Sequence, residues 1–364
     1  MKKSLIALAV LAAAGAASAQ SSVQLYGIAD VWAGQAKITA NGNELYKQNK
    51  VDSGGVNTSR WGLKGSEDLG GGLKATFQLE QGFALDSGKA DAGFNRVSTV
   101  GLSGNFGAVT VGRDWTAYDD LTGLAKNTLG ANISSQATTW VGYNANPNNT
   151  IKFQSNTYNG FSGAASYSFG EDKKTKDANK DVLGKATDTL SLNVQYANGP
   201  LAVGYAYQNA KNQFTAVPGI LLTAADWTGA AQSLVVQGVD LGKGFKVDGS
   251  STSYNLLTGS YDFGVAKLVG SINRAKFDSF KANEYQIGVD VPLASNLILS
   301  GGYANSKLKE NGDEFAKTRG YSAALAYVLS KRTTAYAALN NTKLTSDGDE
   351  VKATVYAVGI KHTF

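Results

Sequence analysis

The sequence predicts an all-β fold: a closed, 16-stranded antiparallel transmembrane β-barrel. Three observations predict it. Apolar residues recur with a period of two along most of the chain, about sixteen such segments follow one another, and short turns alternate with longer polar connections. The composition agrees, since 43 of 364 residues are Gly and only 17% are charged, against roughly 25% in ordinary soluble domains.

A secretory signal peptide is predicted at residues 1–19. Its basic start precedes an apolar run from Ser4 to Gly15 and the small residues Ala17–Ala19. The run is too short for a membrane anchor, which takes roughly 18 or more apolar residues. We expect residues 20–364 to form one barrel domain. Removing the two leader lysines leaves 32 basic against 29 acidic residues, so the charge falls from +5 to +3 and nucleic-acid binding is not indicated.

The strand pattern is clear over 187–198, where Leu190, Leu192 and Val194 alternate with polar residues. An apolar face points to a core in a soluble sandwich and to lipid in a membrane barrel. The second face reads as small and polar, and aromatic residues stand at strand ends, which favours the barrel over a soluble all-β fold. The predicted strands are 22–37, 57–67, 72–83, 93–103, 107–113, 149–158, 161–170, 187–198, 200–210, 252–262, 264–276, 282–292, 296–308, 316–329, 332–344 and 350–364.

The connections fall into two classes that would lie at opposite rims. Short turns such as Asn159-Gly160 and Asn198-Gly199 form one class, since Asn-Gly favours a tight hairpin. Short turns on one rim and longer loops on the other are typical of membrane barrels, and about 16 strands leave an aqueous interior. The second class, mostly longer and polar, comprises 38–56, 84–92, 114–148, 171–186, 211–251, 277–281, 309–315 and 345–349.

Several kinds of chemistry are excluded by composition. The chain has no Cys, and its single His is His362, so disulfide frameworks, cysteine-ligated metals and multi-histidine centres cannot form. A surface hydrolase would need an activated base, and His362 has no evident Ser-Asp neighbourhood. We expect neither an enzyme nor a cofactor.

Six segments in order resemble one family: 22–30, 59–75, 100–113, 261–267, 329–333 and 358–364. They resemble the general diffusion porins of Gram-negative bacteria, which are trimeric and 16-stranded. The resemblance implies a homotrimer in the outer membrane, surrounded by lipid and lipopolysaccharide. It implies a water-filled channel for small hydrophilic solutes and ions. It also implies that the barrel-insertion machinery reads a terminal signal, here Tyr356 and Phe364.

Five residues are selected for a pore constriction. The resemblance implies that the third extracellular loop, 114–148, folds inward and carries an acidic residue, Asp119, opposite a cluster of Arg. Four further charged side chains take the polar parity of their strands: Arg60, Glu80, Arg96 and Lys152. A lipid-facing Arg or Lys would cost about 2–4 kcal/mol at mid-membrane, so these side chains should face the lumen. Three positive charges against two negative ones predict a mild anion preference.

A second role stays open. Loops 171–186 and 211–251 are long enough for recognition, because loops carry function on rigid scaffolds. The chain could therefore act mainly as an adhesin or receptor.

Overall fold

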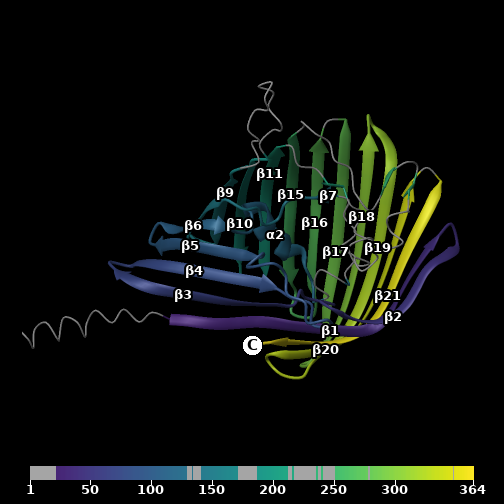
Figure 1. Ribbon diagram of the computed structural model, residues 1–364, viewed down its shortest axis with the longest axis horizontal. Coiled ribbons are helices and arrows are strands. Elements are labelled where there is room, and N and C mark those ends of the chain that lie inside the picture. Colours follow the sequence, from purple (N-terminus) through teal and green to yellow (C-terminus); the bar gives the residue numbers. More distant parts are fainter. Residues whose placement is uncertain are drawn as a thin grey trace, which may run out of the picture.

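The chain folds as one antiparallel sheet of seventeen strands that closes on itself (Figure 1). The computed structural model describes residues 22–128, 133, 141–170, 187–211, 251–277, 279–346 and 348–364, and short strands within 215–240. The barrel strands are β1 (Ser22–Ala40), β2 (Asn43–Ser53), β3 (Arg60–Gly70), β4 (Leu73–Gly82), β5 (Val97–Gly104), β6 (Gly107–Arg113), β8 (Thr150–Gln154), β9 (Phe161–Ser168), β10 (Thr189–Asn198), β11 (Leu201–Lys211), β15 (Ser251–Asp262), β16 (Lys267–Phe277), β17 (Phe280–Ala294), β18 (Leu297–Glu310), β19 (Asp313–Val328), β20 (Thr333–Ser346) and β21 (Asp349–Thr363).

Smaller elements lie outside this sheet. A short helix α2 (Ala117–Thr122) and a 3-10 turn η1 (Gly123–Ala125) follow β6. The two-residue strands β7 (Val141–Gly142) and β12 (Thr215–Ala216) pair with each other, as do β13 (Val235–Val236) and β14 (Val239–Asp240). No helix in the described ranges is long and apolar enough to cross a bilayer.

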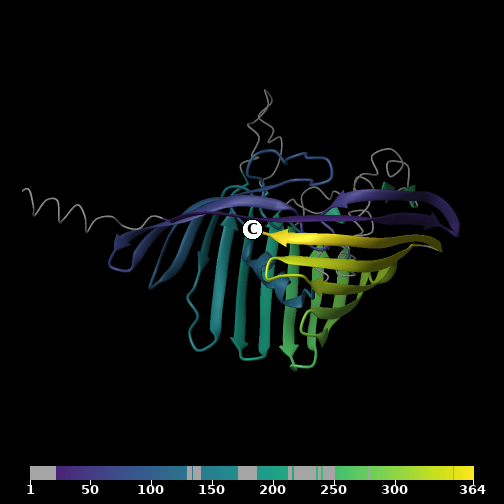
Figure 2. The same ribbon diagram turned by 90° about the horizontal axis from the view of Figure 1, so that it is seen from below.

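Strand β1 closes the barrel because both of its edges are paired. One edge pairs with β21, from Ile28 opposite Thr363 to Ala40 opposite Val351. The other edge pairs with β3 over residues 22–28 and with β2 over 31–40. Figure 2 shows β1, in purple, beside β21, in yellow. Since β2 and β3 share one position, the seventeen strands fill sixteen positions, which confirms the predicted closed 16-stranded barrel.

The prediction of a loop at 38–56 is wrong, because most of this segment belongs to the hairpin of β1 and β2. Strand β1 continues to Ala40 and turns tightly at Asn41 and Gly42, whose φ angles are 49° and 84°. Positive φ at both positions is what a two-residue hairpin requires, and Asn and Gly adopt it readily. The same Asn-Gly turn occurs at Asn311-Gly312, so 309–315 is also mostly strand. Strand β5 begins at Val97 rather than at residue 93, so Arg96 precedes it.

The two faces of the wall follow the predicted alternation. Leu190, Leu192 and Val194 on β10 are 41–49% exposed, whereas Ser191 between them is fully buried. The exposed set also includes Tyr356 and Phe364, which share the outward face of β21 and its end. The apolar outer face matches a lipid-facing surface.

The inner face is less uniformly polar than the sequence indicated. Ala324, Ala338 and Ala357 lie on it and form an apolar cluster with Trp32 and Tyr336. Loop residues pack over this cluster, so these inward positions face protein rather than water. Alternation predicts which face a residue takes, and what covers that face depends on loops distant in sequence.

Several predictions fall on residues outside the described ranges. These include the signal peptide at 1–19, loop 171–186, most of loop 211–251, and residues 129–132 and 134–140 of the third loop.

A substitution at Gly27 tests the contact between β1 and the C-terminal residue, which we call the closing seam of the barrel. Its N–H donates to the carbonyl oxygen of Phe364 at 3.0 Å, and a Cβ there would overlap the Phe364 ring and lie 2.7 Å from the Arg60 carbonyl oxygen. We expect Gly27→Ala to lower the free energy of unfolding by about 1–3 kcal/mol, because the added methyl group overpacks the seam. Heat unfolding in detergent, followed by the electrophoretic shift of the barrel, measures this. The control is Gly301→Ala, where the nearest atom is Val289 Cγ1 at 3.7 Å. Equal stability of the two variants would contradict the seam.

Candidate functional site

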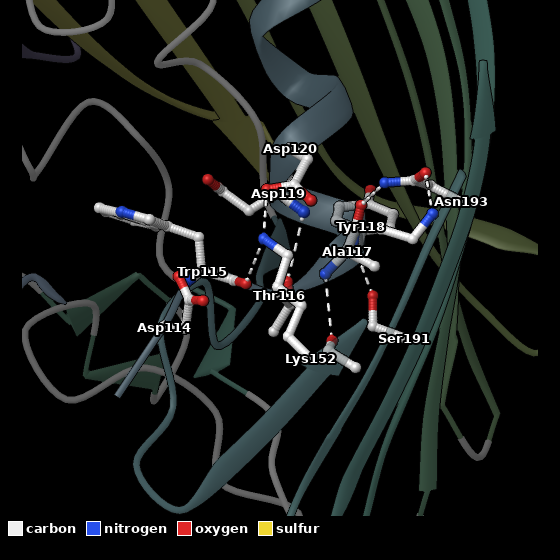
Figure 3. Close-up of polar contacts among 12 residues, drawn as sticks. Asp114, Trp115, Thr116, Ala117, Tyr118, Asp119, Asp120, Lys152, Ser191 and Asn193 are labelled. Carbon is white, nitrogen blue, oxygen red and sulfur yellow. Dashed lines mark hydrogen bonds and ion pairs between the residues drawn. The ribbon is translucent and has the colours of Figure 1, made fainter. Parts of the chain in front are cut away.

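The start of the third loop is held as a short helix against the inner wall. Thr116 caps α2, its Oγ1 accepting the N–H of Asp119 at 3.3 Å, and two Asp residues occupy the first turn. A Thr cap and early acidic residues suit a helix N-terminus. The N–H of Ala117 donates to Ser166 Oγ at 3.1 Å, and that of Tyr118 to Ser191 Oγ at 2.6 Å (Figure 3). Small inward hydroxyl side chains on β9 and β10 thus anchor the helix inside the barrel.

The loop then continues along the wall toward β1. Asn127 Nδ2 donates to the carbonyl oxygen of Gly301 at 2.8 Å, and Thr128 donates to the carboxylate of Asp290 on β17. Farther on, the N–H of Ile133 donates to the carbonyl oxygen of Gly55 at 3.0 Å. The described part of the loop therefore lines the inner face of β9–β18.

Asp119 ties the two ends of this loop together. Its Oδ1 accepts the hydroxyl of Tyr143 at 2.6 Å, and Tyr143 packs edge-on against Tyr118 with ring centroids 4.8 Å apart. Tyr118 in turn donates its hydroxyl to Asn273 Oδ1 on β16 at 2.7 Å. Burial raises the pKa of Asp119 above its ordinary value, against the lowering effect of the Tyr143 hydrogen bond.

Lys152 pairs with the neighbouring acid rather than with Asp119. Its Nζ lies 2.7 Å from Asp120 Oδ1 and donates to the Trp115 carbonyl oxygen at 3.0 Å (Figure 3). Lys152 is 8% exposed on β8, which agrees with its predicted inward direction. Burial raises the pKa of Asp120 to about 6, although Lys152 lowers it. This carboxylate is therefore expected to change its charge near pH 6.

Three predicted residues meet at the inner face of β3 and β4, close to the start of β5. Glu80 Oε1 accepts Arg96 Nε at 2.7 Å, and Glu80 Oε2 lies 3.7 Å from Arg60 Nε. The same oxygen accepts the Tyr26 hydroxyl at 2.9 Å. One carboxylate faces two guanidinium groups, so this cluster keeps a net positive charge.

Trp115 links the two groups of charges, and the sequence reasoning did not select it. The Arg96 guanidinium lies 5.1 Å from the Trp115 ring centroid, while Lys152 binds the Trp115 carbonyl oxygen. A cation over an aromatic face is attracted by the ring quadrupole. Tyr26 was missed as well, although its parity with Gln24 predicts an inward side chain. Within the described residues, no group of three His, Cys, Asp or Glu could hold a metal ion.

The buried carboxylate of Asp30 holds residues 54–57, the segment whose Gly55 carbonyl oxygen accepts the N–H of Ile133. Asp30 is fully buried on β1, and its two oxygens accept the N–H groups of Gly55, Val56 and Asn57 at 2.8–3.2 Å. The hydroxyl of Tyr336 adds a fourth hydrogen bond at 2.7 Å. These contacts hold residues 54–57 inside the barrel between β2 and β3. The segment is thereby a fixed support for the described part of the third loop.

Asp30→Asn tests this support. The amide nitrogen cannot accept a hydrogen bond, so at least one of the three backbone N–H groups loses its partner, and we expect the free energy of unfolding to fall by about 2 kcal/mol. We also expect noisier single-channel current, because the loop contact at Gly55 loosens. Thermal unfolding and current recordings measure these effects. Asp68→Asn is the control, since Asp68 is exposed and its carboxylate accepts the N–H of Gly70, two residues away at a surface turn.

If Asp30→Asn fails to fold, Tyr336→Phe removes a single hydrogen bond of the same carboxylate. If both variants show single-channel current as steady as the wild type and an unchanged free energy of unfolding, Asp30 does not support the third loop.

Comparison with known proteins assigns the family. The model of the family described as Gram-negative porin matches residues 5–347. Outer membrane porin protein 32 of Delftia acidovorans is 36% identical over 99% of this chain and 95% of its own length. An outer membrane porin protein of Bordetella pertussis is 34% identical, with 100% of both chains covered. Among solved structures, an anion-selective porin from Comamonas acidovorans superposes with a TM-score of 0.71 at 27% identity, covering 94% of this chain and 100% of that one.

Relatives of this length and architecture are outer-membrane proteins of Gram-negative bacteria. The closed barrel, its apolar outer face and its charged inner walls agree with that placement. The chain belongs to the Gram-negative porins, the β-barrel channels of the bacterial outer membrane.

Proposed function

We propose that the channel lets small hydrophilic solutes and ions diffuse passively, with a mild preference for anions. The observation that carries the preference is the Glu80 cluster, in which one carboxylate lies between Arg60 and Arg96. Lys64 adds a further positive charge, 5.3 Å from the Tyr26 ring centroid. Charged groups that line a pore favour permeant ions of the opposite sign. The name of the similar Comamonas acidovorans structure, an anion-selective porin, supports the same sign.

The proposal includes an inward-folded third loop that narrows the channel beside charged groups of the barrel wall. The loop supplies Asp119 and Asp120, and the wall supplies Arg60, Glu80, Arg96 and Lys152. Such an arrangement of fixed charges gives an electric field in the pore, because low-dielectric walls focus it. No step of covalent chemistry is needed, so the protein acts as a channel and not as an enzyme.

Assembly follows the family in this proposal. The cleaved signal peptide is 1–19, the barrel-insertion machinery reads Tyr356 and Phe364, and the mature chain forms a homotrimer among outer-membrane lipids and lipopolysaccharide. The outward, exposed positions of Tyr356 and Phe364 on β21 and its end support their availability for recognition.

Planar-bilayer recordings test the channel and its sign. We expect stepwise conductance and, in a salt gradient, a reversal potential on the anion side. The double variant Arg60→Gln with Arg96→Gln should move that potential toward cations, because Glu80 then stands without its cationic partners. Glu80→Gln should move it the other way.

The matched control is Lys331→Gln with Arg332→Gln, which removes the same charge at an exposed turn. Folded wild-type protein without conductance would refute the channel. Identical reversal potentials in all variants would remove the Glu80 cluster from selectivity.

Asp120 predicts a pH dependence. When the pH falls from about 7.5 to about 5 it passes the pKa of Asp120, about 6, so the carboxylate is neutralised and Lys152 loses its anionic partner. The pore gains positive charge, and anion preference should increase. Reversal potentials at the two pH values measure this, and Asp120→Asn should remove most of the step. Asp262→Asn at an exposed turn is the control. An unaltered pH step in Asp120→Asn would contradict the assignment.

A further inference from the structure

A cavity of about 150 Å³ lies between the start of the third loop and the inner wall of β15–β17. The loop contributes Tyr118, Thr122, Lys126 and Tyr143, and the wall contributes mainly polar side chains, among them Glu284. A water molecule takes up about 30 Å³ in the liquid, so the cavity has the volume of roughly five waters. It therefore suits a solute with few heavy atoms rather than an oligosaccharide or a peptide.

The wall of this cavity holds a buried carboxylate. Glu284 on β17 is 3% exposed. Its Oε2 accepts Asn273 Nδ2 and its Oε1 accepts the Ser306 hydroxyl, both at 2.8 Å. Both oxygens act as acceptors, which is the pattern of an ionised carboxylate. These two donors are neutral, so they hold the carboxylate in place while its negative charge stays at the cavity wall.

The third loop fixes the direction of that carboxylate. The Tyr118 hydroxyl donates to Asn273 Oδ1 at 2.7 Å, and the amide nitrogen of the same side chain donates to Glu284. Tyr118 is 2% exposed and packs edge-on against Tyr143, so the first member of this chain of hydrogen bonds is itself held. A connected polar network of this kind is rigid. The carboxylate is therefore preorganised, which lowers the cost of binding a ligand.

Lys126 supplies a charge of the opposite sign. It follows η1, its side chain is exposed, and no salt bridge between residues that the structure describes involves it. Ser271 and Gln286 add a hydroxyl and an amide to the same lining. A small polar cavity with one buried acid and one accessible base matches a solute that itself carries both charges.

We propose that this cavity binds small zwitterionic α-amino acids, with the ammonium group at Glu284 and the carboxylate group at Lys126. The inference rests on the proposed diffusion of small hydrophilic solutes, since the ligand reaches the cavity through the lumen. An ammonium group has three donors, and hydrogen bonds between charged groups are the strong ones. A simple anion is repelled by Glu284 and a simple cation by Lys126, so each binds less well than a solute with both charges.

The test measures equilibrium dissociation constants by ligand-observed NMR, with the full mature chain in neutral detergent at pH 7 and low salt. Glycine is the probe. It should bind more tightly than acetate, which keeps only the carboxylate, and more tightly than methylammonium, which keeps only the ammonium group. Acetamide, of similar size but uncharged, should bind least. This comparison uses the wild type, so it does not depend on whether a variant folds.

Two variants separate the roles of the two charges. Lys126→Gln should weaken glycine binding about fivefold, which is the range of one exposed ion pair. Glu284→Gln keeps the side-chain shape and should weaken binding about tenfold or more, because it removes a charged acceptor from a buried site. Lys361→Gln is the matched control, since Lys361 lies on the inward parity of β21 and outside the cavity lining. It should bind glycine like the wild type.

Equal binding of glycine and acetamide would overturn the proposal, as would glycine binding that Lys126→Gln leaves unchanged. Methylammonium bound as tightly as glycine would make the cavity a site for cations, which also overturns it. Planar-bilayer conductance in salt alone tests the channel. A wild type that conducts but binds no glycine would therefore refute the amino-acid site and leave the proposed channel intact.

Discussion

The pairing of every backbone N–H and C=O in a sheet without edges is the constraint on which the rest of the structure depends. In lipid an unpaired group costs several kcal/mol, and only a helix or a closed sheet avoids that cost. Here β1 supplies the closure, because residues 22–40 pair with β21 on one side and with β2 and β3 on the other. Once the sheet closes, every strand has one outer and one inner face, so successive side chains point alternately to lipid and to the lumen.

That sorting also prepares the inner wall for the loop. Ser166 and Ser191 are inward because Tyr167 and Leu190 are outward, and their hydroxyl groups accept the backbone N–H groups at the start of α2. Unsatisfied N–H groups at a helix start need such partners. The Asp30 carboxylate meets the same need for residues 55–57. The charged walls of the candidate pore are therefore held by polar groups that belong to the barrel.

Much of this could be predicted from local pattern, and the remainder could not. Alternation predicted the strand number and the inward direction of Arg60 and Lys152, because both follow from a period of two. The partners of those charges depend on distant chain segments: Tyr336 reaches Asp30 across 306 residues, and Tyr143 reaches Asp119 across the loop. No spacing rule encodes such contacts. The hairpin at Asn41-Gly42 is different, since the sequence contains its Asn-Gly turn signal although residues 38–56 were predicted as one polar connection.

The two faces treat charge differently, and the difference follows from what each face contacts. Inside, Glu80 lies between Arg60 and Arg96, and Asp120 pairs with Lys152, so acids of the same chain hold these cations in place and compensate part of their charge. A pore must keep these charges fixed, because mobile ones would not define a field. Outside, apolar side chains such as Leu192, Ile272 and Tyr321 cover the wall, and charged side chains pair near the strand ends, as Lys307 does with Glu314 and Lys343 does with Glu350. The outer face is thus matched to lipid by its apolar surface, and the inner face is matched to the loop by its hydroxyl and charged groups.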